Sequence, residues 1–460
     1  MRRTARLLPL VLTAATLIPL QHNDSDPAYT EIPLDGPTVQ ARTEPFGMVA
    51  VTWPEGAAQN VTAKVRIEHD GQWTDWQSLP VEDDHGPDPL VPEGIERAGT
   101  EPLFVGNATG VQASAVNGSG ATIAGAKVVL IQPGVLAGDA DEPAAQSVEP
   151  ASSRAPYPMP LMVSRKRWGA DERLRSHNGA ACARPKYTTT VLAAFVHHTA
   201  DRNDYTRTQV PAMVRAMYAY HVKSRGWCDL GYNFLVDRFG RIFEGRYGGA
   251  QLPVLGAHTA AYNSNSFGVA VIGNFEQAAP PAAMLESTAR VIAWKLDANY
   301  RSPQATIRLD GSSLHTVSGH RDTKATACPG TQLYNKLGWL RQRVNTLMGG
   351  SFSTPIYRYA RTLGFRTIGQ PFWGEHRTRT GWATYFATRD VFYSVASGTH
   401  STAGAFRTRF RRLGAGSARL GLPVTEAYRV PGGSRQKFQR GWLVWDRRTR
   451  QVNLVYGRAS

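Results

Sequence analysis

The hydrophobic pattern of this 460-residue chain changes twice along its length, so we expect several folded parts rather than one. Residues 40–132 alternate in short extended runs separated by turn formers, which predicts a small antiparallel β-domain. Residues 163–348 mix strand-like and helix-like segments, and residues 352–460 return to short strands with glycine turns. Residues 133–162 are rich in Pro, Ala, Ser and acidic side chains without periodicity, which is typical of a linker.

The amino terminus has the composition of a secretory signal peptide. A basic head is followed by an almost wholly apolar run from Leu7 to Leu20, so we expect residues 1–22 to direct export. The run is too short to span a bilayer comfortably, and no other segment of the sequence is apolar enough to do so. An uncleaved anchor is the alternative. The sequence thus predicts a secreted protein, extracellular or cell-wall associated, without stable membrane insertion.

The net charge of +16 is unevenly distributed along the chain. Residues 22–150 contain 5 basic and 20 acidic residues, whereas residues 351–460 contain 19 basic and 4 acidic residues. A basic region of this kind can bind nucleic acid or any other anionic polymer. After a signal peptide, anionic cell-wall polymers are the expected partners rather than nucleic acid. A solvated, Arg-rich surface without a partner is the simpler alternative.

The central part has the pattern of an α/β domain. Apolar residues recur at helical spacing over Thr208–Lys223, Ala282–Leu296 and Gln332–Leu347, which predicts three helices. Val191–Val196 and Gly268–Ile272 are continuous apolar runs and are expected to be buried strands. Strands interspersed with helices indicate a sheet with helices packed on its faces.

Three short polar clusters in the central part contain side chains that suit a metal ion. His197 and His198 end the first buried strand, His320 lies in Ser-Gly-His-Arg-Asp, and Cys328 follows eight residues later in Ala-Cys-Pro-Gly. Two imidazoles and a thiolate suit Zn²⁺, and three protein ligands leave a fourth position for a water that ionises near neutral pH. Taken singly, each histidine could equally have a structural role.

The chain contains three cysteines, an odd number. In an exported protein this implies a free thiol, an intermolecular bridge or a metal ligand. If Cys182 and Cys228 pair in an oxidising compartment, Cys328 remains as the unpaired thiol, and zinc coordination would be a reason to keep it so.

A series of motifs between Ser164 and Leu347 resembles the peptidoglycan recognition protein and N-acetylmuramoyl-L-alanine amidase family. In chain order the matching segments are Ser164-Arg165, Trp168-Gly169-Ala170, Phe195–Ala200, Arg225–Phe234, Asp237–Arg246, Gly256-Ala257-His258, Tyr262–Asn274, Gly319–Asp322 and Ala327–Gly330. The resemblance implies a mixed sheet flanked by helices. It also implies hydrolysis of the bond between the lactyl group of N-acetylmuramic acid and L-alanine.

The same resemblance implies roles for individual residues. It assigns one zinc ion per chain to His197, His320 and Cys328, and matches Tyr232 to the family's catalytic tyrosine. Thr326 falls where other members carry lysine or threonine, and its hydroxyl could donate to a tetrahedral intermediate. Members that only recognise peptidoglycan usually lack the cysteine ligand. The complete set therefore favours an enzyme over the alternative, a non-catalytic peptidoglycan-binding receptor.

The resemblance also implies a substrate preference. Gly226, Trp227 and Arg246 match family positions associated with diaminopimelate-type stem peptides, and a guanidinium could pair with the extra carboxylate of that residue. His258 and Asn263 are expected to line the cleft. The alternatives are that Trp227 packs in the core, that Arg246 is a surface cation and that His258 is structural.

The two ends of the chain have weaker resemblances. Leu420-Gly421-Leu422-Pro423 is similar to the LGFP repeats of actinobacterial cell-wall proteins with one residue changed, and Leu363-Gly364-Phe365-Arg366 departs from them at the proline. Such repeats would hold the enzyme on the wall and raise its local concentration there. The N-terminal β-domain resembles the front half of actinobacterial secreted amidases, and no residue in it is assigned a function.

Overall fold

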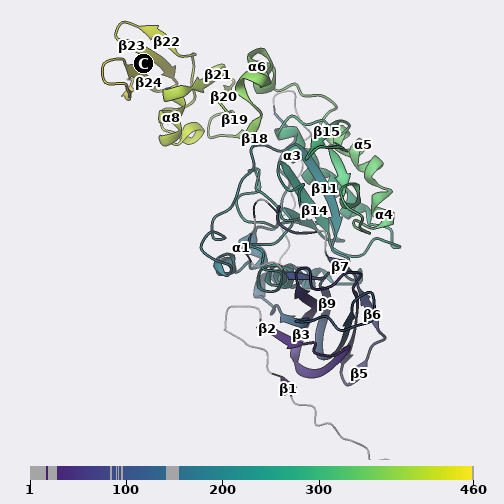
Figure 1. The fold of residues 1–460 in the computed structure, drawn as a ribbon. Helices are drawn as coiled ribbons and strands as arrows, with labels where there is room; N and C mark the ends of the chain where they lie inside the picture. Colours follow the sequence, from purple (N-terminus) through teal and green to yellow (C-terminus); the bar gives the residue numbers. More distant parts are fainter. Residues whose placement is uncertain are drawn as a thin grey trace, which may run out of the picture.

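The computed structural model describes residues 17–18, 28–82, 85–89, 91, 93–94, 97–140 and 155–457. The predicted signal peptide lies outside these residues except for Leu17–Ile18, a short strand β1 that pairs in parallel with β3. No helix among the described residues has the length and apolarity of a membrane span. In Figure 1 the N-terminal sheet, the central domain and the C-terminal units follow one another along the molecule.

The N-terminal part is a largely antiparallel sheet with the order β2-β10-β3-β9-β4-β5. Its strands are β2 (Ala28–Pro33), β3 (Thr38–Pro54), β4 (Thr62–His69), β5 (Gln72–Trp73), β6 (Gln77–Leu79), β7 (Val81–Glu82), β8 (Arg97–Thr100), β9 (Leu103–Val116) and β10 (Lys127–Gln132). The antiparallel β-structure agrees with the sequence pattern, although its first antiparallel strand, β2, already begins at Ala28. Strand β2 lies at the edge and ends in a proline, which an edge strand tolerates because one side of its backbone needs no partner.

The central domain contains a mixed five-stranded sheet with the order β13-β12-β14-β11-β17. Its strands are β11 (Ala193–His198), β12 (Phe234–Val236), β13 (Ile242–Glu244), β14 (Ser266–Val271) and β17 (Val317–Gly319). The strands run parallel except at the β12–β13 pair. All residues of β11 and β14 are buried, which explains why these two strands are continuous apolar runs rather than alternating ones.

Helices cover this sheet, as expected for an α/β domain. They are α1 (Arg165–Trp168), α2 (Val210–Ala219), α3 (Ala282–Ala298), α4 (Thr331–Tyr334) and α5 (Leu337–Leu347). A hairpin of β15 (Thr306–Leu309) and β16 (Ser312–His315) packs against β11. The prediction of one continuous helix over Gln332–Leu347 is wrong, because α4 ends at Tyr334 and α5 begins at Leu337. Leu333 and Leu340 are both buried, so the apolar spacing identified the packed face but not the break.

Helix α2 joins the central domain to the N-terminal sheet. All ten of its residues are buried, as expected for a helix covered on every side. Met213 and Met217 belong to one hydrophobic cluster with Met48 of β3 and Val129 of β10. The N-terminal sheet is therefore packed on the central domain through a shared core.

The described parts of the predicted linker pack against the central domain. Asp139 and Arg215 form a buried ion pair with an Nη2–Oδ2 distance of 2.7 Å. The backbone N–H of the buried Tyr157 donates to Asp297 Oδ2 at 2.6 Å. Residues 141–154 of the predicted linker lie outside the described residues.

The C-terminal part contains two similar units, each with a helix before a four-stranded antiparallel sheet (Figure 1). The first comprises α6 (Pro355–Leu363), α7 (Phe365–Ile368), β18 (Pro371–Arg377), β19 (Trp382–Phe386), β20 (Arg389–Ser394) and β21 (Gly398–Ala403). The second comprises α8 (Gly404–Arg412), β22 (Tyr428–Val430), β23 (Gly433–Phe438), β24 (Gly441–Asp446) and β25 (Gln451–Tyr456). This architecture is consistent with a β-rich repeat module, in which Leu420 and Leu422 pack with Phe410 and Phe438 in the core of the second unit.

Candidate functional site

The three predicted metal ligands meet at one edge of the central sheet. His197 is near the end of β11, and His320 directly follows β17. These strands are parallel neighbours with Val196 opposite Gly319, so the next residue on each strand brings the two histidines side by side. Cys328 returns to the same place, because its carbonyl accepts a hydrogen bond from the N–H of Arg321 at 3.0 Å.

The distances within this cluster suit a single metal ion. The ring centroids of His197 and His320 are 4.7 Å apart, and Cys328 Sγ lies 3.7 Å from His197 Nδ1. Together with a fourth residue, His85, they offer ligand atoms that all lie within 4.8 Å of one another, and all four side chains are buried. Three imidazoles and one thiol form a donor set that fits zinc.

The second nitrogen of His197 has its own partner. His197 Nε2 lies 3.1 Å from Nδ1 of His258, whose Nε2 lies 3.4 Å from the hydroxyl of Ser266. This contact fixes the ring so that Nδ1 faces the cluster. Metal-binding histidines are commonly oriented in this way by a partner on the nitrogen that does not bind the metal. Burial and the nearby His320, His258 and His85 hold the pKa of His197 well below its usual range, so its imidazole is neutral and can act as a ligand.

The three cysteines form one disulfide and leave one free thiol. Cys182 and Cys228 form a disulfide with a Cα–Cα distance of 4.8 Å, and Cys328 is a free, buried cysteine. The sequence left the pairing of the three cysteines open, and the structure contains the Cys182–Cys228 pair. Burial raises the pKa of the Cys328 thiol, and a divalent cation beside it would favour the thiolate instead.

Both predicted catalytic residues lie near the ligands. The buried ring of Tyr232, just before β12, has its centroid 5.4 Å from that of His197. The hydroxyl of Thr326 accepts a hydrogen bond from the backbone N–H of Cys328 at 3.2 Å. Thr326 therefore contributes to the conformation of the loop that carries the thiol.

The five residues predicted to bind substrate are buried rather than exposed. Trp227 stacks on His221 with centroids 4.5 Å apart, and the preceding Gly226 has a positive φ of 78°. Asn263 accepts hydrogen bonds from the backbone N–H groups of His258 and Thr259 at 2.7 and 3.0 Å. His258 lies behind His197, and Arg246 is only 7% exposed. A segment of the N-terminal sheet contacts three of them, Gly226, Arg246 and Asn263.

The residue that sequence reasoning missed is His85, which lies between β7 and β8 of the N-terminal sheet. Its Nε2 is 3.2 Å from His197 Nδ1, and its ring stacks on that of His320 with centroids 4.3 Å apart. On the other side of the ring, Nδ1 lies 3.1 Å from Glu82 Oε1 and 3.4 Å from Glu101 Oε1. The sequence around His85 is acidic and rich in proline, and no spacing connects it to a histidine in another domain.

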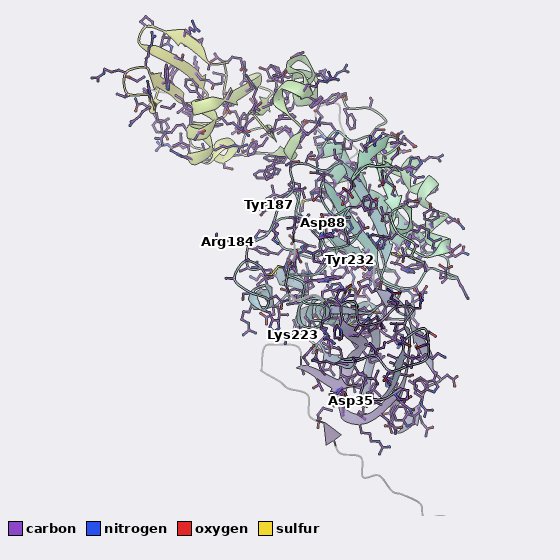
Figure 2. All side chains as sticks on the ribbon, in the orientation of Figure 1. Asp35, Asp88, Arg184, Tyr187, Lys223 and Tyr232 are labelled. Atoms are coloured by element: carbon purple, nitrogen blue, oxygen red, sulfur yellow. A yellow bond between two sulfur atoms is a disulfide. The ribbon has the colours of Figure 1, made fainter. Side chains whose placement is uncertain are left out.

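Two acidic residues from the same segment contact predicted substrate residues. Asn263 Nδ2 donates to Asp88 Oδ1 at 2.7 Å, and the hydroxyl of Ser264 donates to Asp88 Oδ2 at 3.0 Å. Figure 2 places Asp88 within the central domain near Tyr232, far from Asp35 at the other end of the N-terminal sheet.

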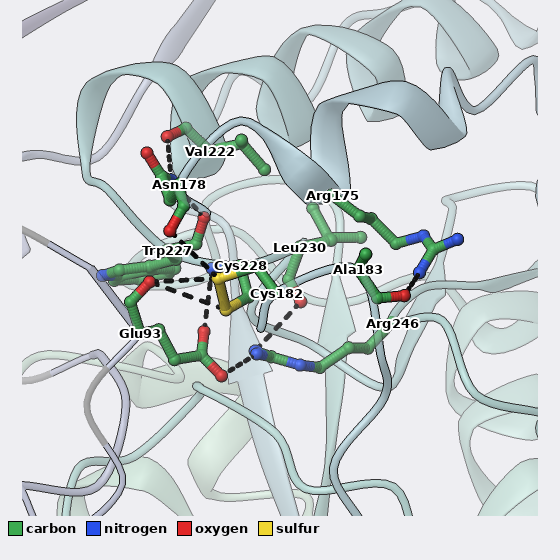
Figure 3. Close-up of a disulfide and its surroundings, with 10 residues drawn as sticks. All are labelled: Glu93, Arg175, Asn178, Cys182, Ala183, Val222, Trp227, Cys228, Leu230 and Arg246. Carbon is green, nitrogen blue, oxygen red and sulfur yellow. Dashed lines mark hydrogen bonds and ion pairs between the residues drawn. A yellow bond between two sulfur atoms is a disulfide. The ribbon is translucent and has the colours of Figure 1, made fainter. Parts of the chain in front are cut away.

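Glu93 of this segment lies beside the disulfide (Figure 3). It forms a buried ion pair with Arg246 and accepts a hydrogen bond from the backbone N–H of Cys228 at 3.0 Å. The guanidinium predicted to bind a carboxylate therefore holds one from its own chain.

Comparison with known proteins supports the assignment of the central domain. Residues 187–331 match the N-acetylmuramoyl-L-alanine amidase family, and residues 14–151 match the Rv3811 N-terminal galactose-binding domain-like family. Peptidoglycan-recognition protein SC1a/b of Drosophila simulans is 35% identical over 147 residues, which are 32% of this chain and 72% of that protein. Peptidoglycan recognition protein 1 of Bos indicus is 33% identical over 174 residues, which are 38% of this chain and 80% of that protein.

Among solved structures, wild-type PGRP-LB of Drosophila is 26% identical, with a TM-score of 0.32. The likeness covers 39% of this chain and 92% of that one. From the sequence relatives, the chain belongs to the peptidoglycan-recognition protein family, through a central domain of the N-acetylmuramoyl-L-alanine amidase type.

Proposed function

We propose that this protein is an exported, zinc-dependent N-acetylmuramoyl-L-alanine amidase. The observation that carries the proposal is the convergence of His197, His320 and Cys328, with His258 supporting the first of them. A receptor that only binds peptidoglycan has no need of a thiol kept outside the disulfide and next to two imidazoles. The reaction would separate the lactyl group of N-acetylmuramic acid from L-alanine.

The residues around the cluster have complementary tasks in this reaction. When bound to His197, His320 and Cys328, zinc would supply Lewis acidity and lower the pKa of a water molecule. The Tyr232 hydroxyl would donate a hydrogen bond to the carbonyl oxygen as negative charge develops on it. Thr326, by binding the Cys328 N–H, keeps the thiol side chain in position.

Substrate binding would use the groups that the N-terminal segment contacts here. The Arg246 guanidinium would pair with the additional carboxylate of a diaminopimelate-type stem peptide. Gly226, Trp227 and Asn263 would line the same groove. The C-terminal units, proposed as LGFP-like repeats, would hold the enzyme at the wall and at its anionic polymers.

The test is mass spectrometry of muropeptides after digestion of purified diaminopimelate-type walls. Both the parent protein and a His85→Ala variant are used, because His85 contacts the ligand His197. We expect intact stem peptides separated from intact glycan strands, and we expect a chelator or Cys328→Ser to abolish the products. Exposed His315 provides the matched control, since His315→Ala leaves the cluster untouched.

The competing function is a non-catalytic peptidoglycan receptor. It is favoured by the fourth side chain in the cluster, because four protein ligands are typical of closed structural zinc sites. Wall binding without any cleavage, by the parent and by His85→Ala alike, would establish the receptor. Cut glycan or cut stem peptides would reject the amidase.

A further inference from the structure

The connection between β7 and β8 lies across the candidate active site. We call its described residues, Glu82, His85–Pro89, Val91, Glu93–Gly94 and Arg97, the β7–β8 segment. It belongs to the N-terminal sheet in sequence but contacts the central domain at the metal cluster, at Asn263 and at Arg246.

The first contact adds a fourth protein ligand to the cluster. A catalytic zinc site keeps three protein ligands and one position for water, whereas a structural site is closed by four. His85 Nε2 lies close to His197 Nδ1, and its side chain is only 1% exposed. With zinc bound to this cluster, the His85 nitrogen would take the position that the water of the proposed reaction needs.

The surroundings of His85 match those of a metal-binding histidine. The nitrogen that faces away from the cluster lies close to carboxylate oxygens of Glu82 and Glu101, both of which are buried. A carboxylate on the outer nitrogen fixes the ring so that the inner nitrogen offers its lone pair to a metal, an arrangement common among zinc ligands. The outer nitrogen of His197 also has a partner, which is the imidazole of His258.

The second and third contacts occupy the proposed substrate groove. Asp88 accepts hydrogen bonds from the Asn263 and Ser264 side chains, and Glu93 forms an ion pair with Arg246. Glu93 thus provides the kind of group, a carboxylate, that Arg246 would otherwise receive from the substrate. A side chain at Gly94 would meet the Gly226 carbonyl oxygen at 2.5 Å, so the segment approaches the Gly226 backbone too closely for any residue but glycine.

Both ends of the β7–β8 segment are held by a single arginine. Arg225 forms a buried ion pair with Glu82 at one end and donates from Nε to the Arg97 carbonyl at 2.7 Å at the other. The shared core around α2 keeps the N-terminal sheet in place as well. Because the contact is intramolecular, the segment is present at a high effective concentration.

We propose that the protein folds as a latent enzyme in which His85 supplies the fourth ligand to the metal and Glu93 occupies the carboxylate-binding Arg246. The proposal rests on the proposed function, since latency needs an activity to suppress. Opening would let water take the place of the His85 nitrogen and would free the Arg246 guanidinium, with no covalent bond broken.

The coordination is tested with Co²⁺ in place of zinc, using azide as a small anion that binds an open metal position. In the parent protein, four protein ligands leave no exchangeable position, so we expect its visible d–d absorption to stay constant during an azide titration. In His85→Ala the spectrum should shift and saturate, while His315→Ala should behave like the parent. A parent spectrum that shifts as far as that of His85→Ala would overturn the proposal.

Latency is tested by the release of new amino termini from purified walls. If the parent is mostly closed, its rate of wall cleavage is the rate of the open form multiplied by the open fraction. His85→Ala should therefore cleave faster than the parent by about tenfold or more. Equal rates would reject latency while leaving the amidase intact. A change of the cobalt spectrum in His85→Ala with no cleavage by any form would instead reject the amidase and retain the fourth ligand.

A second variant covers the case in which His85→Ala does not fold. Glu93→Gln keeps the shape of the side chain and its hydrogen bond to Cys228 but removes the charge that pairs with Arg246. We expect Glu93→Gln to cleave walls faster than the parent. Its cobalt spectrum should shift with azide, but less than that of His85→Ala. No increase in cleavage by Glu93→Gln, with the fold shown intact by circular dichroism, would count against latency.

Discussion

At the site, the two ring nitrogens of His197 face two different parts of the chain. Nδ1 faces Cys328 and His85, and Nε2 faces His258. The residues of the central domain could be predicted because their motifs follow one another in the order of a known family. His85 could not, because only tertiary packing brings an isolated histidine of one domain to the ligands of another. The same holds for Glu93, whose partner Arg246 was identified without it.

Asp201 is a second residue whose role depends on contact between domains. It is buried and accepts a hydrogen bond from the backbone N–H of Phe104 in β9 at 3.0 Å. Burial raises its pKa to about 7, although the N–H groups of Phe104 and Arg202 oppose this effect. The folded state therefore binds this proton more tightly than the unfolded chain does. As pH rises from about 4 to 7, the unfolded chain loses the proton first, and the free energy of unfolding falls. Above pH 7 the loss of stability is complete and no longer depends on pH.

We therefore expect Asp201→Asn to stabilise the protein at pH 8 and to have little effect at pH 4. At about 1.4 kcal/mol for each unit of pKa difference, the gain at pH 8 is about 2–4 kcal/mol. Thermal unfolding of the parent and the variant at both pH values measures it. A stability difference that is the same at pH 4 and pH 8 would show that folding does not raise the pKa of Asp201.

At the scale of elements, the strands and helices of the central domain were largely predictable, because each has a clear hydrophobic period. Strand β11 extends to His198, two residues beyond the predicted Val196, since the register with β14 continues through both histidines. The break between α4 and α5 was missed because the buried positions keep helical spacing across it. The sequence of the β7–β8 segment has no hydrophobic period. Its course depends instead on ion pairs with residues far away in sequence.

The ion pair between Arg225 and Glu82 is the clearest of these anchors. Both side chains are buried, and His221 and His85 also face Glu82. Burial disfavours ionisation of this carboxyl, yet Arg225 and the two histidines hold its pKa below its usual range. Removing one charge of a buried pair leaves the other uncompensated, which typically costs about 3–5 kcal/mol.

We expect Arg225→Met to lower the free energy of unfolding by about 3 kcal/mol or more, and the double variant with Glu82→Gln to recover much of that loss. Denaturant unfolding of the parent, both single variants and the double variant completes the cycle. Additive effects of the two substitutions would mean that the pair is not coupled and that another contact positions the segment.

At the scale of the molecule, the C-terminal units are strongly basic, with 19 basic and 4 acidic residues over 351–460. If they hold the enzyme on anionic wall polymers, binding of the full chain to purified walls should weaken as salt is raised. Arg447→Gln with Arg448→Gln, in the exposed turn after β24, should reduce both the affinity and its salt dependence. Unchanged binding to walls stripped of phosphate-rich polymers would assign the attachment to peptidoglycan itself.

The metal cluster also makes a prediction about how the whole molecule unfolds. Its ligands come from two domains that already share a core at α2, so a bound ion would join them a second time. An ion that binds only the folded state raises Tm according to its affinity for that state. In the parent, removal of zinc should therefore lower the Tm of the N-terminal sheet and the central domain together.

In His85→Ala the ion would contact the central domain alone, so zinc removal should cause a smaller shift, and the N-terminal sheet should lose its dependence on the metal. Calorimetry of both proteins with zinc and with a chelator distinguishes these outcomes, and His315→Ala again serves as the control. Equal shifts in the parent and in His85→Ala would mean that His85 does not bind the ion. The segment would then cover the groove only through Asp88 and Glu93, and the metal would keep its open position in the resting protein.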